Sequence, residues 1–346
     1  MAGIDGAFTT GLDRTDRSTL VDVWGIQIDR QGGPDELIWR ELPDPNPGKG
    51  EVVVELAAAG LNYIDVYHRS GLYPVVLPYV PGLEGAGSVI AVGEGVVWPA
   101  VGDRVGWANA AGSYAEQMVV PADKCVSVPE TVPFEVAAAV LLQGMTAHFL
   151  THDTFPLDET HRCLIHAGAG GVGLLLVQIA KLLGAEVFTT VGSPDKAELA
   201  TAAGADHVIL YRDVDFAEQI VELAGSRPLD VVYDGVGRET FSRGLGLLRL
   251  RGTMVSFGNA SGPVEPLSPL ELSANGSLFL TRPTLFHHTI TQAETQRRAD
   301  DLFRWIEAGR LDVRIGAKYD LQDAADAHRA LEGRETTGKV LLIPSP

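Results

Sequence analysis

Short runs in which apolar and polar residues alternate, divided by glycine and proline, fill the first part of the chain. A two-residue period of this kind predicts β-strands, and the close spacing of the turns predicts a compact β domain. Residues 21–40 are expected to form two strands joined by a turn, and residues 44–50 a loop. The further strands expected here are residues 51–56, 85–92, 103–107 and 114–120.

The period lengthens at residues 134–142, which predicts a helix, and from residue 162 apolar strand-like and helix-like runs alternate. Such alternation predicts a doubly wound parallel sheet with helices on both faces. Strands are expected at residues 162–166, 186–191, 206–210, 229–233, 253–257 and 278–281, and helices at 172–183, 197–203, 216–224 and 291–309. The last strand, residues 339–343, is expected to return to the first domain.

A glycine-rich run, HAGAGGVG at residues 166–173, lies between the first of these strands and its helix. Gly168, Gly170 and Gly173 have the G-x-G-x-x-G spacing that serves a tight turn, close approach of the backbone to a pyrophosphate, and close helix packing. Free N–H groups and the positive end of the helix dipole then hold the anion. The motif alone is weak in a chain with 39 glycines, so its place between strand and helix carries the prediction of a dinucleotide site.

Size and charge narrow the function further. A chain of 346 residues suggests two domains. The net charge of −18 repels phosphate backbones and anionic membranes, so nucleic acid is not expected as a partner. The apolar runs at residues 136–142 and 174–183 are short, so no membrane-spanning helix is expected.

The two cysteines and the first residues bear on location. Cys125 and Cys163 have no second cysteine nearby, so both are expected to be packing residues in a protein of the reducing cytoplasm. Residues 1–20 carry Asp and Arg without an apolar core, and match neither a secretory signal nor a transit peptide. We expect them to form a flexible extension.

The end of the second strand of the parallel sheet predicts the cofactor. An Asp or Glu there binds the ribose 2′-hydroxyl of NAD, but this chain has Val191, Gly192 and Ser193. Without that acid a 2′-phosphate is not repelled, and Lys196 and Tyr211 follow strand ends from which they could reach it. NADPH is therefore expected, although each of these two residues alone could equally be an ordinary surface side chain.

Several motifs together give a resemblance. These are GLNYIDVYHRSGLYP at residues 60–74, PGLEGAG at 81–87, VGDRV at 101–105, and later VVYDGVGRETF, MVSFGN, SLFLTRP and TGKVLLIP. With the glycine-rich run, they make the chain similar to the zinc-independent quinone oxidoreductases of the medium-chain dehydrogenase/reductase superfamily. The resemblance implies a GroES-like catalytic domain from residues 21–143 and 285–346. A Rossmann domain of residues 144–284 is inserted in it, with the active cleft at their junction.

The resemblance also implies a set of site residues. Asn62 and Tyr67 are expected to line the nicotinamide end, and Gln143 and Thr146 to contribute to cofactor binding, although bacterial members carry lysine at the position of Gln143. The pyrophosphate is expected at Gly170, Gly171, Val172 and Gly173, and the 2′-phosphate at Gly192, Ser193, Lys196, Tyr211 and Arg334. The nicotinamide and its ribose are expected beside Phe257, Gly258, Asn259, Leu280, Thr281 and Arg282, and the acceptor beside Tyr73 and Phe286.

No metal is expected. Zinc-dependent relatives carry a cysteine where this chain has Asn62, and a His-Glu pair where it has Leu83 and Glu84. The chain also lacks the cysteines of a structural zinc lobe, so thiolate and imidazole ligands at suitable spacing do not occur.

Quinone reduction fits a site without a metal. The hydroquinone oxyanion is stabilised by its aromatic ring, whereas an alcohol dehydrogenase must stabilise a far more basic alkoxide. Asn62 and Tyr67 are the candidate donors to the developing oxyanion. Alternatively, Asn62 satisfies a strand end and Tyr67 is a wall against which nicotinamide packs.

Other functions remain open at this point. The same metal-free hydride geometry would serve an alkenal or enone reductase, and the protein could also bind NADPH with little turnover. The last strand of the parallel sheet, within residues 276–283, would be a β-rich edge. Family precedent implies a homodimer joined through that edge.

Overall fold

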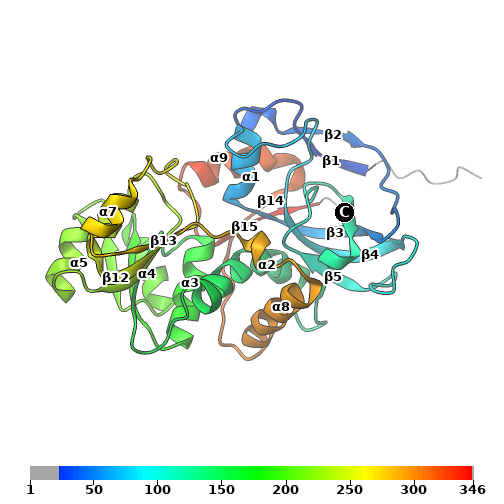
Figure 1. Cartoon of the computed structure of the whole chain (residues 1–346). Coiled ribbons are helices and arrows are strands. Elements are labelled where there is room, and N and C mark those ends of the chain that lie inside the picture. Colours follow the sequence, from blue (N-terminus) through cyan, green and yellow to red (C-terminus); the bar gives the residue numbers. More distant parts are fainter. Residues whose placement is uncertain (1–22, 345–346) are drawn as a thin grey trace, which may run out of the picture.

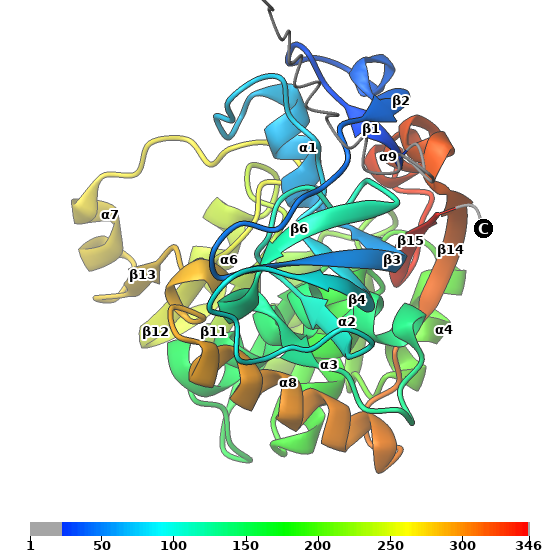
Figure 2. The ribbon, with the colours of Figure 1, turned by 90° about the vertical axis from the view of Figure 1, so that its right-hand side faces the viewer.

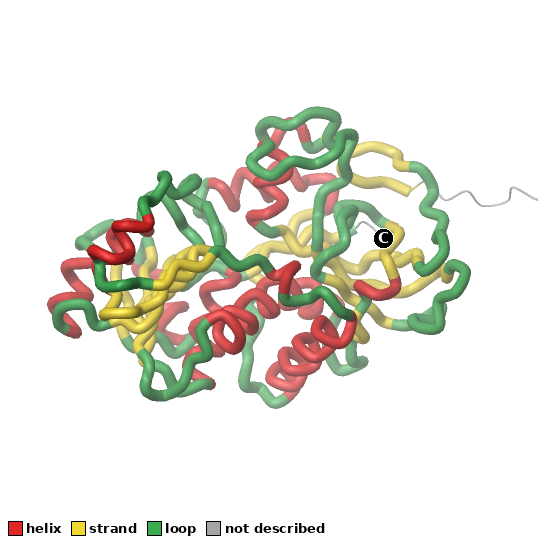
Figure 3. The backbone as a smooth tube through the Cα atoms, viewed as in Figure 1, coloured by secondary structure: helices red, strands yellow, loops and turns green. Residues whose placement is uncertain are grey.

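The computed structural model describes residues 23–344. The expected extension at residues 1–20 lies outside the described residues. Two large sheets, each with its own helices, form the two lobes of Figure 1, and a separate two-stranded sheet belongs to one of these lobes. Figure 3 shows the strands gathered in two separate groups with helices between them.

The lobe on the right of Figure 1 is a mostly antiparallel β domain built from both ends of the chain. Its central strand β3 (Glu51–Leu61) pairs with β4 (Glu84–Val92), β6 (Gln117–Pro121) and β15 (Lys339–Ile343). Figure 2 shows β14 and β15 beside β3, so the carboxyl-terminal strand returns to the first domain as predicted. The remaining strands are β1 (Val23–Gln27), β2 (Ile38–Leu42), β5 (Arg104–Trp107), β7 (Val126–Ser127) and β14 (Ile315–Asp320).

The other lobe holds a parallel sheet with the order β10-β9-β8-β11-β12-β13. In chain order this is the doubly wound arrangement of dinucleotide-binding domains, and it confirms the predicted fold class. The direction of winding reverses between β8 and β11, and ligands bind at the carboxyl ends of the strands beside such a reversal. The strands are β8 (Arg162–His166), β9 (Glu186–Val191), β10 (His207–Leu210), β11 (Leu229–Asp234), β12 (Leu248–Ser256) and β13 (Phe279–Thr281).

Three helices of this lobe, α3 to α5, follow the predicted alternation with some shifted ends, whereas α6 and α7 were not predicted. α4 begins at Pro194 rather than at residue 197, because Ser193 adopts the extended N-cap conformation and proline suits the first turn. β12 begins at residue 248, five residues before the expected start. The helices are α3 (Gly171–Leu182), α4 (Pro194–Ala202), α5 (Phe216–Ala224), α6 (Phe241–Leu247) and α7 (Pro269–Ala274).

Helix α2 (Phe134–Phe149) is longer than predicted and belongs to both lobes. It packs on β3, β4 and β5 of one lobe and on α3 of the other. The expected domain boundary at residue 143 therefore falls inside one continuous helix. With its π-helical extension the helix spans Phe134–Thr154, which is long and apolar enough to cross a membrane, contrary to the sequence prediction. However, 72% of the 18-residue apolar window within this helix is buried inside the protein, as in a core helix.

Two helices of the catalytic lobe were not predicted, α1 (Tyr63–Ser70) and α9 (Ala324–Glu332). α1 starts with a capping box, in which Asn62 and Asp65 satisfy each other's backbone N–H groups. The Tyr63 hydroxyl donates to the Leu331 carbonyl over 3.2 Å and ties α1 to α9. The long helix α8 (Gln292–Glu307) falls within the predicted range and packs on α2.

The edge of the parallel sheet is shorter than expected. The predicted strand at residues 276–283 is observed only as β13 (Phe279–Thr281), which pairs with β12 on one side. Within residues 23–344, its outer edge pairs with no other strand.

Candidate active site

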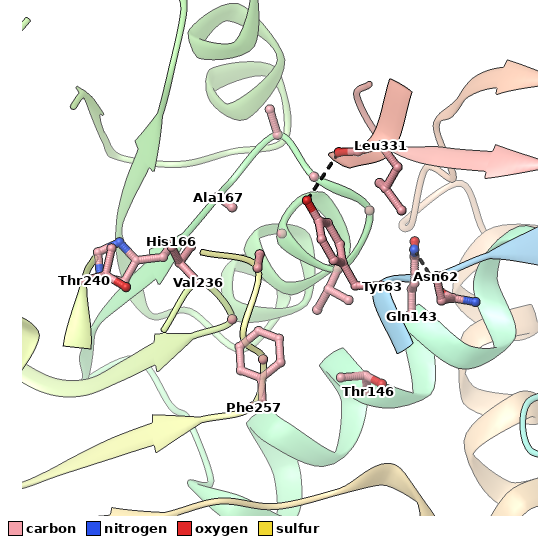
Figure 4. Close-up of a pocket in the computed structure, with 18 of the residues that line it drawn as sticks. Asn62, Tyr63, Gln143, Thr146, His166, Ala167, Val236, Thr240, Phe257 and Leu331 are labelled. Carbon is pink, nitrogen blue, oxygen red and sulfur yellow. Dashed lines mark hydrogen bonds between the residues drawn. The ribbon is translucent and has the colours of Figure 1, made fainter. Parts of the chain in front are cut away.

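A cavity of about 830 Å³ lies where the two lobes meet. One wall comes from the carboxyl ends of the parallel strands, with His166 at the end of β8, Val191 at the end of β9 and Phe257 directly after β12. The other wall comes from α1 and α2 of the catalytic lobe. In Figure 4 the cavity extends from His166 and Thr240 to Asn62 and Gln143.

The glycine-rich loop forms the middle of the cavity wall. Gly170 is the N-cap of α3 and places no capping side chain on it, so the first backbone N–H groups of the helix have no internal partner. A Cβ atom added to Gly170 would approach only the Ala167 carbonyl oxygen, at 3.2 Å, whereas one added to Gly173 would come within 2.2 Å of that oxygen. Gly170 thus keeps the helix end open to a ligand, and Gly173 allows the helix to pack on the loop.

The predicted tight turn is made differently. Ala167, not glycine, has the left-handed backbone conformation, with φ of 58°. A Cβ atom on Gly168 would lie 2.0 Å from the Thr189 hydroxyl oxygen, so this glycine lets the loop lie close against β9. The loop, the open helix end and its positive dipole fit a pyrophosphate.

A group of cations lies beyond the end of β9. The Lys196 ammonium donates to the Arg334 carbonyl over 2.7 Å. Burial lowers the pKa of Lys196, and the neighbouring positive charges of Arg212 and Arg334 lower it further. Gly192 and Tyr211 line the cavity beside this group, and Ser193 does not. The arrangement fits a ribose phosphate, and Arg212 is a member that the sequence did not reveal.

Asn62 lies in a buried polar cluster next to the cavity. Its Nδ2 donates to the Gly60 carbonyl over 3.1 Å and to the Glu84 carboxylate over 2.8 Å, while its Oδ1 accepts from Gln143 and Lys339 over 3.1 and 2.9 Å. Both amide hydrogens are therefore used within the protein. This corrects the expectation that Asn62 donates to a substrate oxyanion, because the amide instead completes the end of β3.

The ammonium group of Lys339 contacts Asn62 and Glu84, two positions that the resemblance compares with zinc ligands. Lys339 forms an ion pair with Glu84, and both side chains are fully buried. Burial lowers the pKa of Lys339, and the Glu84 carboxylate opposes that shift. The Leu142 N–H donates to the other carboxylate oxygen over 2.7 Å. The cluster is held together by charge and hydrogen bonds from four separate segments, namely the ends of β3, β4 and β15 and the middle of α2.

Gln143 connects this cluster to the glycine-rich loop. Its Nε2 donates to Asn62, while Oε1 is buried and has no hydrogen-bond partner within the described part of the chain. A Cβ atom on Gly171 would lie 2.0 Å from Oε1, so the loop passes directly over the amide. A buried acceptor left unpaired costs free energy. It fits a donor supplied by a bound molecule, such as a ribose hydroxyl.

Tyr67, on α1, differs from Asn62 because its donor hydrogen is not used within the described part of the protein. Its hydroxyl oxygen accepts a hydrogen bond from the Asn259 backbone N–H over 2.9 Å, which leaves the hydroxyl hydrogen available to a ligand in the cavity. Burial raises the pKa of Tyr67 to about 12, so the phenol stays protonated at neutral pH. The ring meets Tyr73 edge to face, with 5.1 Å between centroids.

The comparisons with known proteins agree with this geometry. Residues 48–130 match the alcohol dehydrogenase GroES-like domain, and residues 171–307 match the zinc-binding dehydrogenase family. The quinone oxidoreductase of Pseudomonas aeruginosa is 44% identical over 321 residues, which cover 92% of this chain and 99% of the relative. The chain belongs to the zinc-independent quinone oxidoreductase family of the medium-chain dehydrogenase/reductase superfamily.

Two further members of the same wide family extend the comparison. The 2-haloacrylate reductase of a Burkholderia species is 39% identical over 330 residues, covering 93% of this chain and 99% of that relative. The solved structure of Escherichia coli quinone oxidoreductase in complex with NADPH superimposes with a TM-score of 0.91 at 43% identity. That match covers 93% of this chain and 100% of the other.

One matching family takes its name from zinc. Among residues 23–344, no group of three or more His, Cys, Asp or Glu side chains is placed to hold a metal ion. Cys125 and Cys163 are both buried, and burial raises the pKa of the Cys125 thiol to about 12.

Most residues that the quinone oxidoreductase resemblance implied lie on the cavity wall. Besides those already described, Thr146, Val172, Gly258 and Phe286 line it. Three others do not: Leu280 and Thr281 belong to β13, and Asn259 acts through its backbone on Tyr67. Arg282, directly after β13, does line the cavity.

Sequence reasoning missed the end of the cavity near β10 and β11. His166 lines it, with Nδ1 on the Thr190 hydroxyl at 2.9 Å and its ring edge-on to Phe216. Thr240 and Arg243 complete this end. His166 ends a strand, and Phe216 begins the helix after one, so the rule that ligands bind at carboxyl ends of parallel strands could have found both.

Proposed function

We propose that the protein transfers a hydride from NADPH to a quinone in this cavity, without a metal. The observation that carries the proposal is one continuous cavity joining three features. These are the open end of α3, the cations around Lys196, and an aromatic cleft in which Tyr67 offers a free hydroxyl hydrogen. The E. coli relative solved with NADPH supports the choice of cofactor.

Each part of the cavity has a role in this proposal. The N–H groups of Gly171, Val172 and Gly173 bind the pyrophosphate, and Lys196 and Arg334 bind the 2′-phosphate. The unpaired oxygen of Gln143 accepts from a ribose hydroxyl. Phe257 and Gly258 flank the nicotinamide.

Quinone reduction by this route needs little acid–base catalysis from the protein's side chains. Bound NADPH would supply the hydride, which reduces the quinone to the hydroquinone monoanion. Tyr67 donates a hydrogen bond to the oxygen on which the negative charge develops, and that oxygen then takes one proton from solvent. The products are the hydroquinone and NADP⁺, so the quinone gains one hydride and one proton in total. Holding the acceptor against the nicotinamide is the main contribution.

A second candidate is reduction of an electron-poor carbon–carbon double bond. It is favoured by the similarity to 2-haloacrylate reductase at 39% identity, because the same hydride geometry serves both acceptors. A protein that binds NADPH with little turnover is the third candidate. Initial rates with 1,4-naphthoquinone and with an enone, each with NADPH, separate the three. Selective turnover of the enone would replace the first proposal, and no turnover of either would favour the third.

We also propose a homodimer in the cytoplasm, with neither a membrane nor a nucleic acid as partner. The outer edge of β13 supports the dimer, since Phe279 is 61% exposed there and Leu250 on the adjacent strand is 64% exposed. Joining two such edges would extend the sheet and cover these side chains. Sedimentation of a monomer at micromolar concentration would contradict the dimer. The two buried free thiols support the cytoplasmic location. The net charge of −18 supports the absence of anionic membranes and nucleic acids as partners.

A further inference from the structure

The charged side chains that line the cavity are divided unequally between its two ends. At the end near β9, β10 and β11, Arg334 pairs with Glu239 over 3.4 Å, and Lys196 donates to the Arg334 carbonyl. Arg243 pairs with Asp215 at the same end. These five residues surround the places proposed for the adenosine and its phosphate.

Arg282 is the one further charged side chain on the cavity wall of the described chain, and it lies at the other end. It follows β13 directly and is exposed to solvent in the cleft. No carboxylate among residues 23–344 forms an ion pair with it. Its Nη2 donates to the Tyr73 hydroxyl oxygen over 3.1 Å and, with the Asn259 amide in the orientation that satisfies its neighbours, to the Asn259 side-chain oxygen over 3.1 Å. Three of its five N–H donors have no acceptor among the described residues.

Two phenols near Arg282 are also donors. Tyr73 uses its oxygen as the acceptor for Arg282, and Tyr67 uses its oxygen as the acceptor for Asn259, so both hydroxyl hydrogens remain available. His68 lines the same end, and burial lowers its pKa, which favours the neutral imidazole. The acceptor end of the cleft therefore presents one guanidinium and two phenolic hydrogens, with no carboxylate on its wall.

We infer that Arg282 recognises an anionic substituent of the electron-accepting substrate, such as a carboxylate, a sulfonate or an ionised ring hydroxyl. A guanidinium binds such oxygens through paired N–H groups. The overall charge of −18 disfavours anions elsewhere on the protein, so this cation distinguishes the cleft from the rest of the surface. The inference rests on the proposed function and narrows its substrate class.

The test compares two quinones that differ by one charge, 1,4-naphthoquinone and 1,4-naphthoquinone-2-sulfonate. Arg282→Gln should lower kcat/KM for the sulfonate about 10- to 100-fold more than it lowers kcat/KM for the neutral quinone. Arg282→Lys should restore part of the difference, because it keeps the charge without the paired donors. Arg310→Gln, at an exposed position away from the cavity, is the matched control and should leave both values unchanged.

A binding measurement separates failure of this inference from failure of the proposed function. The dissociation constant of redox-inert 2-naphthalenesulfonate is measured on the protein saturated with NADP⁺. Arg282→Gln should raise this dissociation constant about tenfold or more. Equal dissociation constants in the two proteins, or equal losses with both quinones, would overturn the inference. If neither quinone is reduced but sulfonate binding still depends on Arg282, the proposed function fails and the anion site stands.

Discussion

The backbone N–H of Asn259 donates a hydrogen bond to the hydroxyl oxygen of Tyr67 over 2.9 Å. Tyr67 belongs to α1 of the catalytic lobe, and Asn259 follows β12 of the parallel sheet, so this bond crosses the cleft. It uses the phenol oxygen as an acceptor, and the hydroxyl hydrogen has no acceptor among the described residues. Asn62, five residues earlier, has both amide hydrogens bound internally. Of the two expected donors, Tyr67 is the one with a hydrogen to offer a substrate.

Tyr67→Phe should lower kcat for quinone reduction about tenfold, less than the loss usual for an oxyanion donor, because the hydroquinone oxyanion is already stabilised by its ring. The KM for NADPH should change less than about twofold. Tyr79→Phe is the control, since Tyr79 hydrogen-bonds His68 and does not line the cavity. Steady-state kinetics with a neutral quinone check both, and an unchanged kcat in Tyr67→Phe would remove the donor from the mechanism.

Gly170→Ala should weaken NADPH and NADH alike, by about tenfold or more, because the added methyl group stands at the open end of α3 where a pyrophosphate binds. The new Cβ would lie 3.2 Å from the Ala167 carbonyl oxygen, so the fold should accommodate it with a backbone shift of a few tenths of an ångström. Gly246→Ala, at an open position in α6, is the matched control. Calorimetric titration with both dinucleotides tests the loop. Weaker binding of only one dinucleotide would show that Gly170 does not contact the pyrophosphate, which the two dinucleotides share.

Lys196→Ala should weaken NADPH about 10- to 100-fold and NADH less than about twofold, because it removes a charge-assisted contact that only the 2′-phosphate makes. The control is Lys318→Ala, which removes a surface cation paired with Glu135. Dissociation constants from fluorescence titration give the comparison. Equal weakening of both dinucleotides would show that Lys196 does not contact the 2′-phosphate.

His328 makes the stability depend on pH. Its Nδ1 lies 3.1 Å from Arg69 and must accept, and its Nε2 lies 3.1 Å from the Tyr114 hydroxyl. Burial, with the Arg69 charge, lowers the pKa of His328 from 6.5 to about 3. Between these values the unfolded chain binds a proton that the folded protein does not, so the stabilisation is complete above pH 6.5 and is lost as pH falls.

His328→Gln should therefore flatten the pH dependence. Between pH 6 and pH 4.5 the free energy of unfolding of the parent protein should fall more steeply than that of the variant, by about 1.4 kcal/mol per pH unit. Glutamine can keep both hydrogen bonds without titrating. Urea unfolding across this range measures both slopes, and parallel slopes would mean that His328 is protonated in the folded protein.

Local patterns were enough to predict the parallel sheet and the glycine-rich loop. β8, β9 and α5 begin and end within a residue of the expected positions, because each is a contiguous apolar or amphipathic run bounded by turn residues. α1 was missed although Asn62 and Asp65 form a capping box and Gly71 ends the helix with a positive φ. That short segment contains too few apolar positions to display a helical period.

The partners of Asn62 could not be read from local sequence. Glu84 lies 22 residues away and Lys339 lies 277 residues away, and only the return of β15 beside β3 brings the lysine to the amide. Arg212 was missed for a similar reason, since its charge matters only beside Lys196 and Arg334. Residue type predicted which groups could act, and the tertiary structure determined which of them are free.

We propose that this chain reduces quinones with NADPH and needs no metal to do so. The most direct measurement is anaerobic turnover of 1,4-benzoquinone by protein dialysed against a strong chelator, following NADPH loss and hydroquinone formation together. We expect one hydroquinone for each NADPH, at a rate that added zinc does not raise. Activity that appears only when zinc is restored, or NADPH loss without hydroquinone, would contradict the account.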